Sequence, residues 1–417
     1  MTSSQLTLLT AGVAIYLALA RYLRYQRRDA INARFTHRPL SSMTIPEAHE
    51  IIRELRELEF PYTMHTAMKI SLLKHHINVA STVKTGSIPT MTKLFIATGQ
   101  LNERNASKRA ADTEVVLSEV HDRLPGSDPH LLGIARMNYL HARFRKAGKI
   151  LDQDMLHTLG SAVVDIMRCV DRHEWRGLTE VEKCAVGVFH KALGDAMEIP
   201  FTGFLPSAAQ KDGWRDGAHF MEEICEWTLE YERQVAKTTE STRMIGRRLL
   251  DLATFNVPVC LRGIVEGVVV TKLDEHIRSS MGFEKPSLFI SSFAQSIMAL
   301  RKRVLRYLSL PRPRSMRVRV LSDEPDMATG LYTTSLWIAH PWYVQPTFMH
   351  RWGPKAWFIW LFGSGAVPTR EGKYRENGYD LWTIGPAAQE KRGKEEMQAL
   401  FEGLKQSGYA EGCPFHR

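Results

Sequence analysis

Two stretches of the sequence place polar side chains on helical faces that otherwise carry apolar residues. The stretch RMNYLHARFRKAGKI begins at Arg136 and contains one histidine among five cationic side chains. A 3.6-residue period places His141 on one stripe with Met137 and Leu140. Arg136 and Arg143 fall on roughly the opposite side. His141 therefore points inward, either as a satisfied core histidine or as a ligand for a buried metal or haem.

The second stretch is SKRAADTEVV, in which Arg109, Asp112 and Thr113 stand at positions i, i+3 and i+4 of a helix. Val116 and Val120 continue the same face as an apolar stripe, so a guanidinium, a carboxylate and a hydroxyl lead into the core. Burying such groups costs roughly several kcal/mol unless they are paired or serve a ligand. The pattern leaves two interpretations open, an internal Arg109–Asp112 ion pair that caps the stripe, or a polar binding site.

The elements that must position these residues are predicted to be helices. TIPEAHEIIRELRELEF begins with a capping Thr44, has Pro46 early in the helix and carries acids near its start. Helical periods recur through residues 107–120, 151–170, 179–197 and 213–235, separated by turn signals such as LPGSDP and RGLT. Because no alternating run is long enough for a sheet core, the sequence predicts one large all-α domain.

The first 25 residues are predicted to anchor the chain in a membrane. QLTLLTAGVAIYLALA, from Gln5 to Ala20, has no charge, and with the next three residues it reaches the low end of a spanning length. A secretory signal peptide would carry its positive charges first, whereas here the arginines follow the apolar run. The positive-inside rule therefore predicts a single-pass anchor with the rest of the chain in the cytosol.

Composition narrows the class of protein further. The chain has 417 residues, of which 44% are hydrophobic and 24% charged, and its formal charge is +10. The five cysteines are scattered without a CxxC pair, which argues against a zinc site or a disulfide framework and suits a reducing compartment. Nucleotide-binding glycine motifs, HExxH and GxSxG are absent from the sequence.

The C-terminal third has a different character. Eight Lys or Arg and no acid stand between Arg301 and Arg319, and a stretch dense in Trp, Tyr and Phe follows. A basic run beside an apolar aromatic block suits a membrane interface, although a solvated charged face beside ordinary core remains open. Because the aromatics are not interleaved with the basic residues, nucleic-acid binding is not expected. The predicted regions are 1–25 (anchor), 40–300 (helical catalytic domain) and 301–417 (irregular, membrane-proximal).

Several of these stretches together resemble a known family. KRAADT, ARMNYLHARFRKAGKI, EWRGLTEVEKCAVGVFHKALGDAM, DGAHFMEEICEW, VLRYLSLPRP and YVQPTFMHRWGP occur in this order. They resemble the fungal ER-bound oxygenases of the mycophenolic acid pathway type, the mpaB oxygenase family. That family shares its catalytic domain more distantly with bacterial rubber oxygenases, the latex-clearing proteins. The likeness covers most of the chain, including the N-terminal anchor.

The resemblance implies specific roles for the residues above. Rubber oxygenases hold a b-type haem in an all-helical fold, and the helix of their proximal histidine matches the helix of His141. Arg109 and Thr113 match an arginine and a threonine near the distal side, where they would stabilise bound oxygen or orient the substrate. Rubber oxygenases carry a lysine where this chain has Asp112, which suggests a more open iron and a carboxylate that organises Arg109. Arg145 lies about 40° around the helix from His141 and is the expected partner of a haem propionate.

Two further departures accompany the resemblance. Residues 75–85 look like an insertion, and His190 stands where the fungal relatives carry an aromatic residue.

The expected protein is thus a haem-dependent oxygenase anchored in the endoplasmic reticulum membrane. It would use O2 to cleave a C=C bond in a prenyl or similarly lipophilic chain during secondary-metabolite biosynthesis. A membrane-tethered haem- or lipid-binding protein without turnover would use the same buried histidine and basic region, so this alternative stays open. The sequence predicts neither the substrate's identity nor the oligomeric state.

Overall fold

The regular elements in the part of the chain that the structure describes are helices. The computed structural model describes residues 2–61, 63–64, 84–337, 339–363 and 366–415. Most of the predicted insertion at 75–85 lies outside the described residues. Short 3-10 and π segments join α-helices with these bounds: α1 Ser3–Arg24, α2 Gln26–Ala33, α3 Ile45–Glu54, α6 Pro89–Ala97, α7 Ala106–Asp122, α8 Asp128–Lys146, α9 Asp152–His173, α10 Glu180–Ala196, α11 Gly217–Val235, α12 Glu240–Ala253, α13 Val259–Thr271, α14 Glu275–Ser280, α15 Leu288–Tyr307, α16 Phe348–Trp352, α17 Pro354–Phe362 and α18 Lys394–Gln406.

The all-α prediction is confirmed for the described part of the chain. Its only β pairing there consists of two isolated bridges, Leu321 with Thr334 and Tyr332 with Tyr379. Helix starts follow local capping rules, as predicted for Thr44, whose hydroxyl accepts from the Glu47 backbone N–H while the Glu47 carboxylate accepts from the Thr44 N–H. Such caps satisfy donors that a helix start would otherwise leave unpaired.

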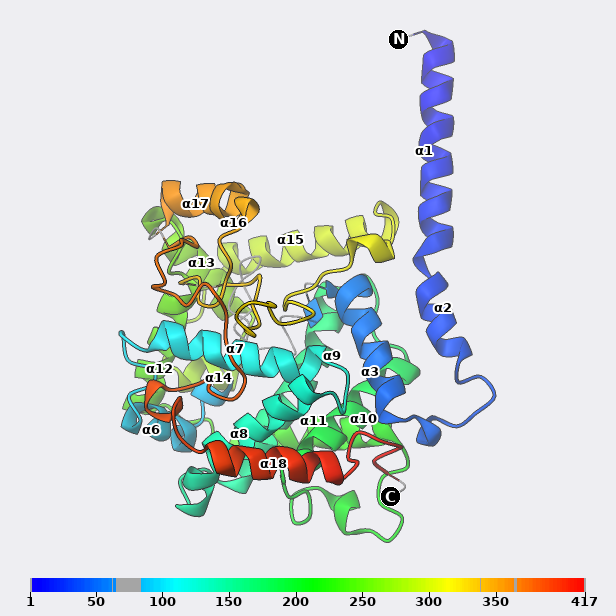
Figure 1. The fold of residues 1–417 in the computed structure, drawn as a ribbon. Coiled ribbons are helices and arrows are strands. Elements are labelled where there is room, and N and C mark those ends of the chain that lie inside the picture. Colours follow the sequence, from blue (N-terminus) through cyan, green and yellow to red (C-terminus); the bar gives the residue numbers. More distant parts are fainter. Residues whose placement is uncertain (1, 62, 65–83, 338, 364–365, 416–417) are drawn as a thin grey trace.

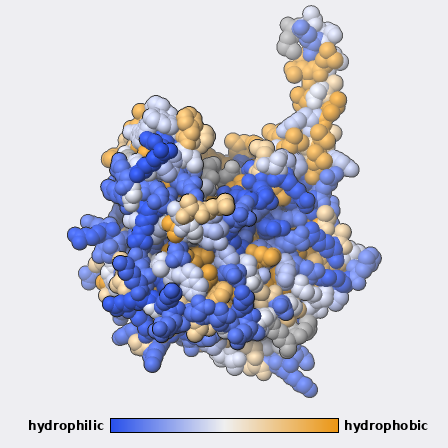
Figure 2. Space-filling view, viewed as in Figure 1, coloured by the Kyte–Doolittle hydropathy of each residue, from blue (hydrophilic) through white to orange (hydrophobic). Residues whose placement is uncertain are grey.

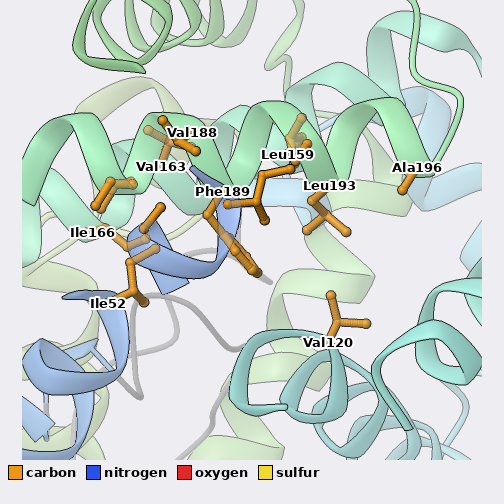
Figure 3. Close-up of a cluster of buried hydrophobic side chains, with 14 of the residues drawn as sticks. Ile52, Val120, Leu159, Val163, Ile166, Val188, Phe189, Leu193 and Ala196 are labelled. Carbon is orange, nitrogen blue, oxygen red and sulfur yellow. The ribbon is translucent and has the colours of Figure 1, made fainter. Parts of the chain in front are cut away.

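The core that supports the domain lies between α9, α10, α3 and α7. Figure 3 shows Phe189 of α10 among apolar side chains of α9, with Ile52 of α3 and Val120 of α7 close by. Phe189, Ile52 and Val120 are all buried. Because close-packed interiors resist changes in volume, this core holds α7, α9 and α10 in fixed relative positions.

Helices α10 and α11 approach each other through two glycines. A Cβ on Gly187 would overlap the carbonyl oxygen of Gly217, and a Cβ on Gly217 would overlap the carbonyl oxygen of Cys184. Only glycine at these two positions permits the backbones of α10 and α11 to lie this close together. The pair therefore sets how closely α11 packs against the helix that carries His190.

We expect Gly187→Ala to destabilise the domain by about 3 kcal/mol, because the new methyl group meets rigid backbone that cannot move aside. The measurement is unfolding of the full-length protein in detergent, followed by helical circular dichroism. Gly403→Ala in α18 is the matched control, since a Cβ there meets open space. That control should be neutral or gain about 0.5–1 kcal/mol from helix propensity. Equal stability of the two variants would contradict the close approach.

The C-terminal segment returns to cover α8. Figure 1 shows α18 lying along α8, and a loop just before α18 accepts three hydrogen bonds from Arg136. The acceptors are the carbonyl oxygens of Ile384 at 2.6 Å, Thr383 at 3.0 Å and Gln389 at 3.2 Å. Arg136 is fully buried. The side of α8 roughly opposite the apolar stripe is therefore also covered at Arg136, by a segment distant in sequence.

Helix α1 stands apart from the domain. It continues into α2, and residues Ser3–Ala33 form one helical stretch with a mean hydropathy of 1.7 in its most apolar part, of which 6% is buried. Figure 1 shows α1 rising away from the body of the molecule. Its length and composition suffice to cross a bilayer, as predicted for residues 1–25.

Candidate functional site

A cavity of about 270 Å³ lies among α6, α7, α8, α9, α10 and α12. Its walls are mainly apolar side chains, such as Leu94, Val116, Leu140 and Leu193. The polar side chains of interest in its lining are Arg109, Asp112, Thr113, His121, His141, Lys149, Asp154, Thr158 and His190. Four of the five residues singled out from the sequence, Arg109, Asp112, Thr113 and His141, therefore line one cavity. An apolar cavity with few polar groups suits a lipophilic small molecule.

His141 reaches this cavity from the last third of α8. It keeps some accessible surface, and because protein surrounds the ring, that surface faces the cavity. Burial, reinforced by the positive charges of Arg109 and Arg145, lowers the pKa of His141 from 6.5 to about 4. The ring is therefore neutral near pH 7. Its buried Nδ1 has no hydrogen-bond partner among the described residues.

Arg109 and Thr113 form one polar unit on α7. The Thr113 hydroxyl donates to the Arg109 carbonyl at 2.8 Å, and a guanidinium nitrogen of Arg109 donates to the Thr113 oxygen. Burial lowers the pKa of Arg109, although the carboxylate of Asp112 acts in the opposite direction. The guanidinium nevertheless stays charged, as arginine does in proteins. It offers the cavity a donor and a positive charge beside the neutral imidazole of His141.

The carboxylate of Asp112 accepts hydrogen bonds from Lys108 and Tyr343. Lys108 donates to both carboxylate oxygens, at 2.9 and 3.2 Å, and the Tyr343 hydroxyl donates at 2.6 Å. Lys108 also donates to the Gly385 carbonyl at 2.8 Å. Of the two interpretations left open by the sequence, the internal pair is formed with Lys108 in the place of Arg109. Asp112 fastens the C-terminal segment to α7, where Gly385 completes the cavity wall.

Arg145 lies outside the cavity lining and is bonded to acceptors of the protein itself. Its guanidinium donates to the carbonyl oxygens of Met197 at 3.2 Å and Glu198 at 2.9 Å, and to Asp152 at 3.3 Å. These bonds tie the end of α8 to the chain after α10. A haem propionate at Arg145 would have to replace some of them. Arg109 and Lys149 are the cationic side chains in the described cavity lining.

His190 is a second imidazole in the cavity wall that the predicted site residues did not include. Its Nδ1 bonds the Val186 carbonyl at 2.8 Å, which leaves Nε2 as the acceptor nitrogen. That Nε2 is buried and has no partner in the described part of the chain. Burial lowers the pKa of His190 to about 4. The sequence signal was its helical stripe, because Leu193 and Met197 follow at i+3 and i+7 and line the same cavity.

The residues present fit a haem. An unpaired buried imidazole nitrogen costs about 1–3 kcal/mol unless a ligand binds it, and a neutral imidazole is the form that binds iron. The apolar walls suit a porphyrin face, and Arg109 and Lys149 provide cations for its carboxylates. The site would therefore hold the group through His141, with His190 as another nitrogen facing the same space.

A second polar cluster lies apart from this cavity. One ligand atom each from Glu232, Asp274 and His276 lies within 4.8 Å of the others. Glu232 already accepts from His157 at 3.2 Å and His276 at 3.2 Å, and Asp274 pairs with Arg168. Burial acts to raise the pKa of Glu232, but these hydrogen bonds and the charge of Lys84 outweigh it and lower the pKa below 4.5. The cluster is an ionic network that joins α9, α11 and α14.

Comparison with known proteins shows that the chain is similar to fungal oxygenases. No protein-family model matches it. It is 35% identical to "ER-bound oxygenase mpaB'" of Penicillium brevicompactum over 96% of this chain and 92% of the relative. It is also 33% identical to "ER-bound oxygenase mpaB" of the same fungus, over 88% of this chain and 85% of the relative. The corresponding oxygenase of Penicillium roqueforti (strain FM164) is 33% identical over 64% of this chain and 86% of the relative.

These relatives support a membrane-associated oxygenase of the endoplasmic reticulum that acts on a small molecule. The cavity and the apolar N-terminal helix agree with that description. The chain belongs to the family of ER-bound mpaB oxygenases.

Proposed function

We propose that this oxygenase cleaves a C=C bond in the prenyl or similar lipophilic chain of a secondary metabolite, using O2 and a b-type haem held by His141. The observation that carries the proposal is the neutral, unpartnered imidazole of His141 in an apolar cavity. The arginines that follow the anchor favour a catalytic domain facing the cytosol.

Different residues of the cavity would have different roles in this reaction. Bound haem would supply the binding and activation of O2. Apolar side chains of α6, α8, α9 and α12 would align the alkene and exclude water. Arg109 and Thr113 offer a positive charge and a hydroxyl at the same end as His141, where they would stabilise developing negative charge or orient the substrate. Asp112 would act through Lys108 and Tyr343, by keeping the C-terminal wall closed.

The reaction is balanced when each carbon of the alkene becomes a carbonyl carbon, so that each fragment receives one oxygen atom from O2. The test uses full-length, haem-loaded protein in detergent with a prenylated aromatic compound. We expect O2 uptake and two labelled carbonyl fragments from ¹⁸O2. The same compound with a saturated chain is the matched control and should give neither.

Two results would count against this proposal. Equal O2 uptake with the saturated compound would show that the double bond is not the reacting group. A hydroxylated but intact product would identify a different oxygenase reaction.

A further inference from the structure

Helix α15 turns its apolar side toward the outside. Phe289, Phe293, Ile297, Leu300 and Val304 follow one another at i+4 or i+3 spacing, which places them on one stripe. All are exposed, Phe289 by 79% and Leu300 by 60%. In a water-soluble domain such a stripe packs against the core. Its exposure therefore marks a surface that contacts something apolar.

The other side of α15 is fastened to the domain by polar groups. Arg301 donates to the His173 carbonyl and to Glu174, the latter at 3.0 Å, and Lys302 donates to the Asp171 carbonyl at 2.8 Å. These contacts hold the helix with its apolar stripe outward. The orientation is thus fixed by two half-buried hydrogen bonds and one exposed hydrogen bond to α9 and the residue just after it.

Neighbouring helices extend this apolar surface. Figure 1 shows α13, α16 and α17 at the same end of the molecule as α15, the end from which α1 rises, and Figure 2 shows apolar side chains on this edge and along α1. Helix α17 is held by the buried side chains of Ala356 and Ile359, which pack with Trp337. The exposed members on these helices are Val259, Leu261, Ile264, Phe348, Met349, Trp352, Trp357, Trp360, Leu361 and Phe362.

The position of α1 relates this surface to a bilayer. The Tyr16 hydroxyl donates to the Leu308 carbonyl at 2.7 Å, just after α15 ends. At 1.5 Å per residue, Tyr16 lies about 20 Å from the start of α1, whereas the hydrocarbon core is about 30 Å thick. If the start of α1 lies at the far edge of the core, the C-terminal end of α15 sits about 10 Å inside the near edge, the depth typical of interfacial helices. Figure 1 shows α15 running crosswise to α1, as such helices do.

We propose that the exposed apolar stripe of α15, with the exposed side chains of α13, α16 and α17, is a membrane-docking surface that inserts into the monolayer beside the anchor. Exposed Arg303 and Arg306 lie in the last turns of α15, and exposed Arg314 and Arg317 follow it. They would meet anionic headgroups. Tryptophans on α16 and α17 suit the same interfacial depth. The surface goes beyond the oxygenase reaction and stands independently of the haem assignment.

The test measures how deeply labelled side chains of the full-length protein enter the bilayer. Native Cys260 on α13 is exposed and can carry an environment-sensitive NBD fluorophore. Phe289→Cys in a Cys260→Ser background places the same label on α15. Gln406→Cys in that background is the matched control, because α18 lies at the opposite end of the molecule in Figure 1. The proteins are reconstituted into phosphatidylcholine vesicles with or without a nitroxide on the acyl chain.

We expect nitroxide lipid to lower the emission at Cys260 and at Phe289→Cys by about twofold or more, and to leave Gln406→Cys almost unchanged. Unquenched emission at both surface positions would overturn the proposal. Blue-shifted but unquenched emission would overturn it too, since a second copy or another protein would then cover the surface. Equal quenching of all three labels would show association without a defined face and would also contradict it.

Discussion

His141→Ala should lose most of its haem while keeping its helical fold. If His141 supplies the iron bond, its removal takes away the principal attachment of the cofactor. A merely structural histidine supplies packing and one hydrogen bond, so its loss would cost about 1–3 kcal/mol and leave the haem content per folded molecule unchanged. The measurement is Soret absorbance per folded protein, with folding judged from helical circular dichroism.

His130→Ala provides the matched control for this experiment. His130 is buried on the same helix, α8, but it bonds the Tyr409 hydroxyl and lies outside the described cavity lining. It should lose stability and keep haem. Full occupancy with an unshifted spectrum in His141→Ala would disprove the ligand assignment. Absence of haem from the reconstituted parent would remove the cofactor from the proposal, while leaving the oxygenase family untouched.

Arg109→Ala and Thr113→Ala should keep haem and lose turnover. Removing one preorganised donor from an active site lowers kcat on the order of 10²-fold. Thr113→Ser retains the hydroxyl and should recover much of the rate. Arg109→Lys keeps the positive charge but lacks the planar guanidinium with its several fixed N–H donors. It should therefore recover only part of the rate. Oxygen uptake and carbonyl products, divided by haem-loaded protein, give kcat and KM for each variant.

Arg143→Ala controls for the loss of an arginine near the same site. Arg143 is exposed on α8 and stacks on Phe144. It should behave like the parent. Parallel loss of haem and turnover in the Arg109 and Thr113 variants would assign both residues to structure rather than catalysis. A raised KM with unchanged kcat would restrict their role to substrate binding.

Local patterns predicted much of this site because it is built from helix faces. The 3.6-residue period alone brings Arg109, Asp112 and Thr113 to one side of α7, and it points His141 inward. Their meeting at one cavity follows from helices that are close in sequence. The anchor and the capping of α3 are likewise local features, and both agree with the structure.

What the periodicity did not predict depends on contacts between residues far apart in the chain. Arg136 lies roughly opposite the apolar stripe, and carbonyls about 250 residues later bury it. The internal Arg109–Asp112 pair was one of two interpretations, and Tyr343 and Lys108 hold Asp112 instead. Periodicity reveals that a helix has two faces but not what covers each one. The same limit applies to α15, whose exposed stripe has the spacing of a core-facing stripe.

The late position of Gly385 and α18 in the chain also sets the order in which the protein can mature. Helix α1 leaves the ribosome first and can enter the membrane while most of the chain is still unmade. The segment that closes the cavity and covers Arg136 is among the last to be synthesised. Until then α8 lacks its cover and exposes surface that chaperones recognise. A chain that ends before Gly385 would therefore keep α1 but lack this part of the cavity wall.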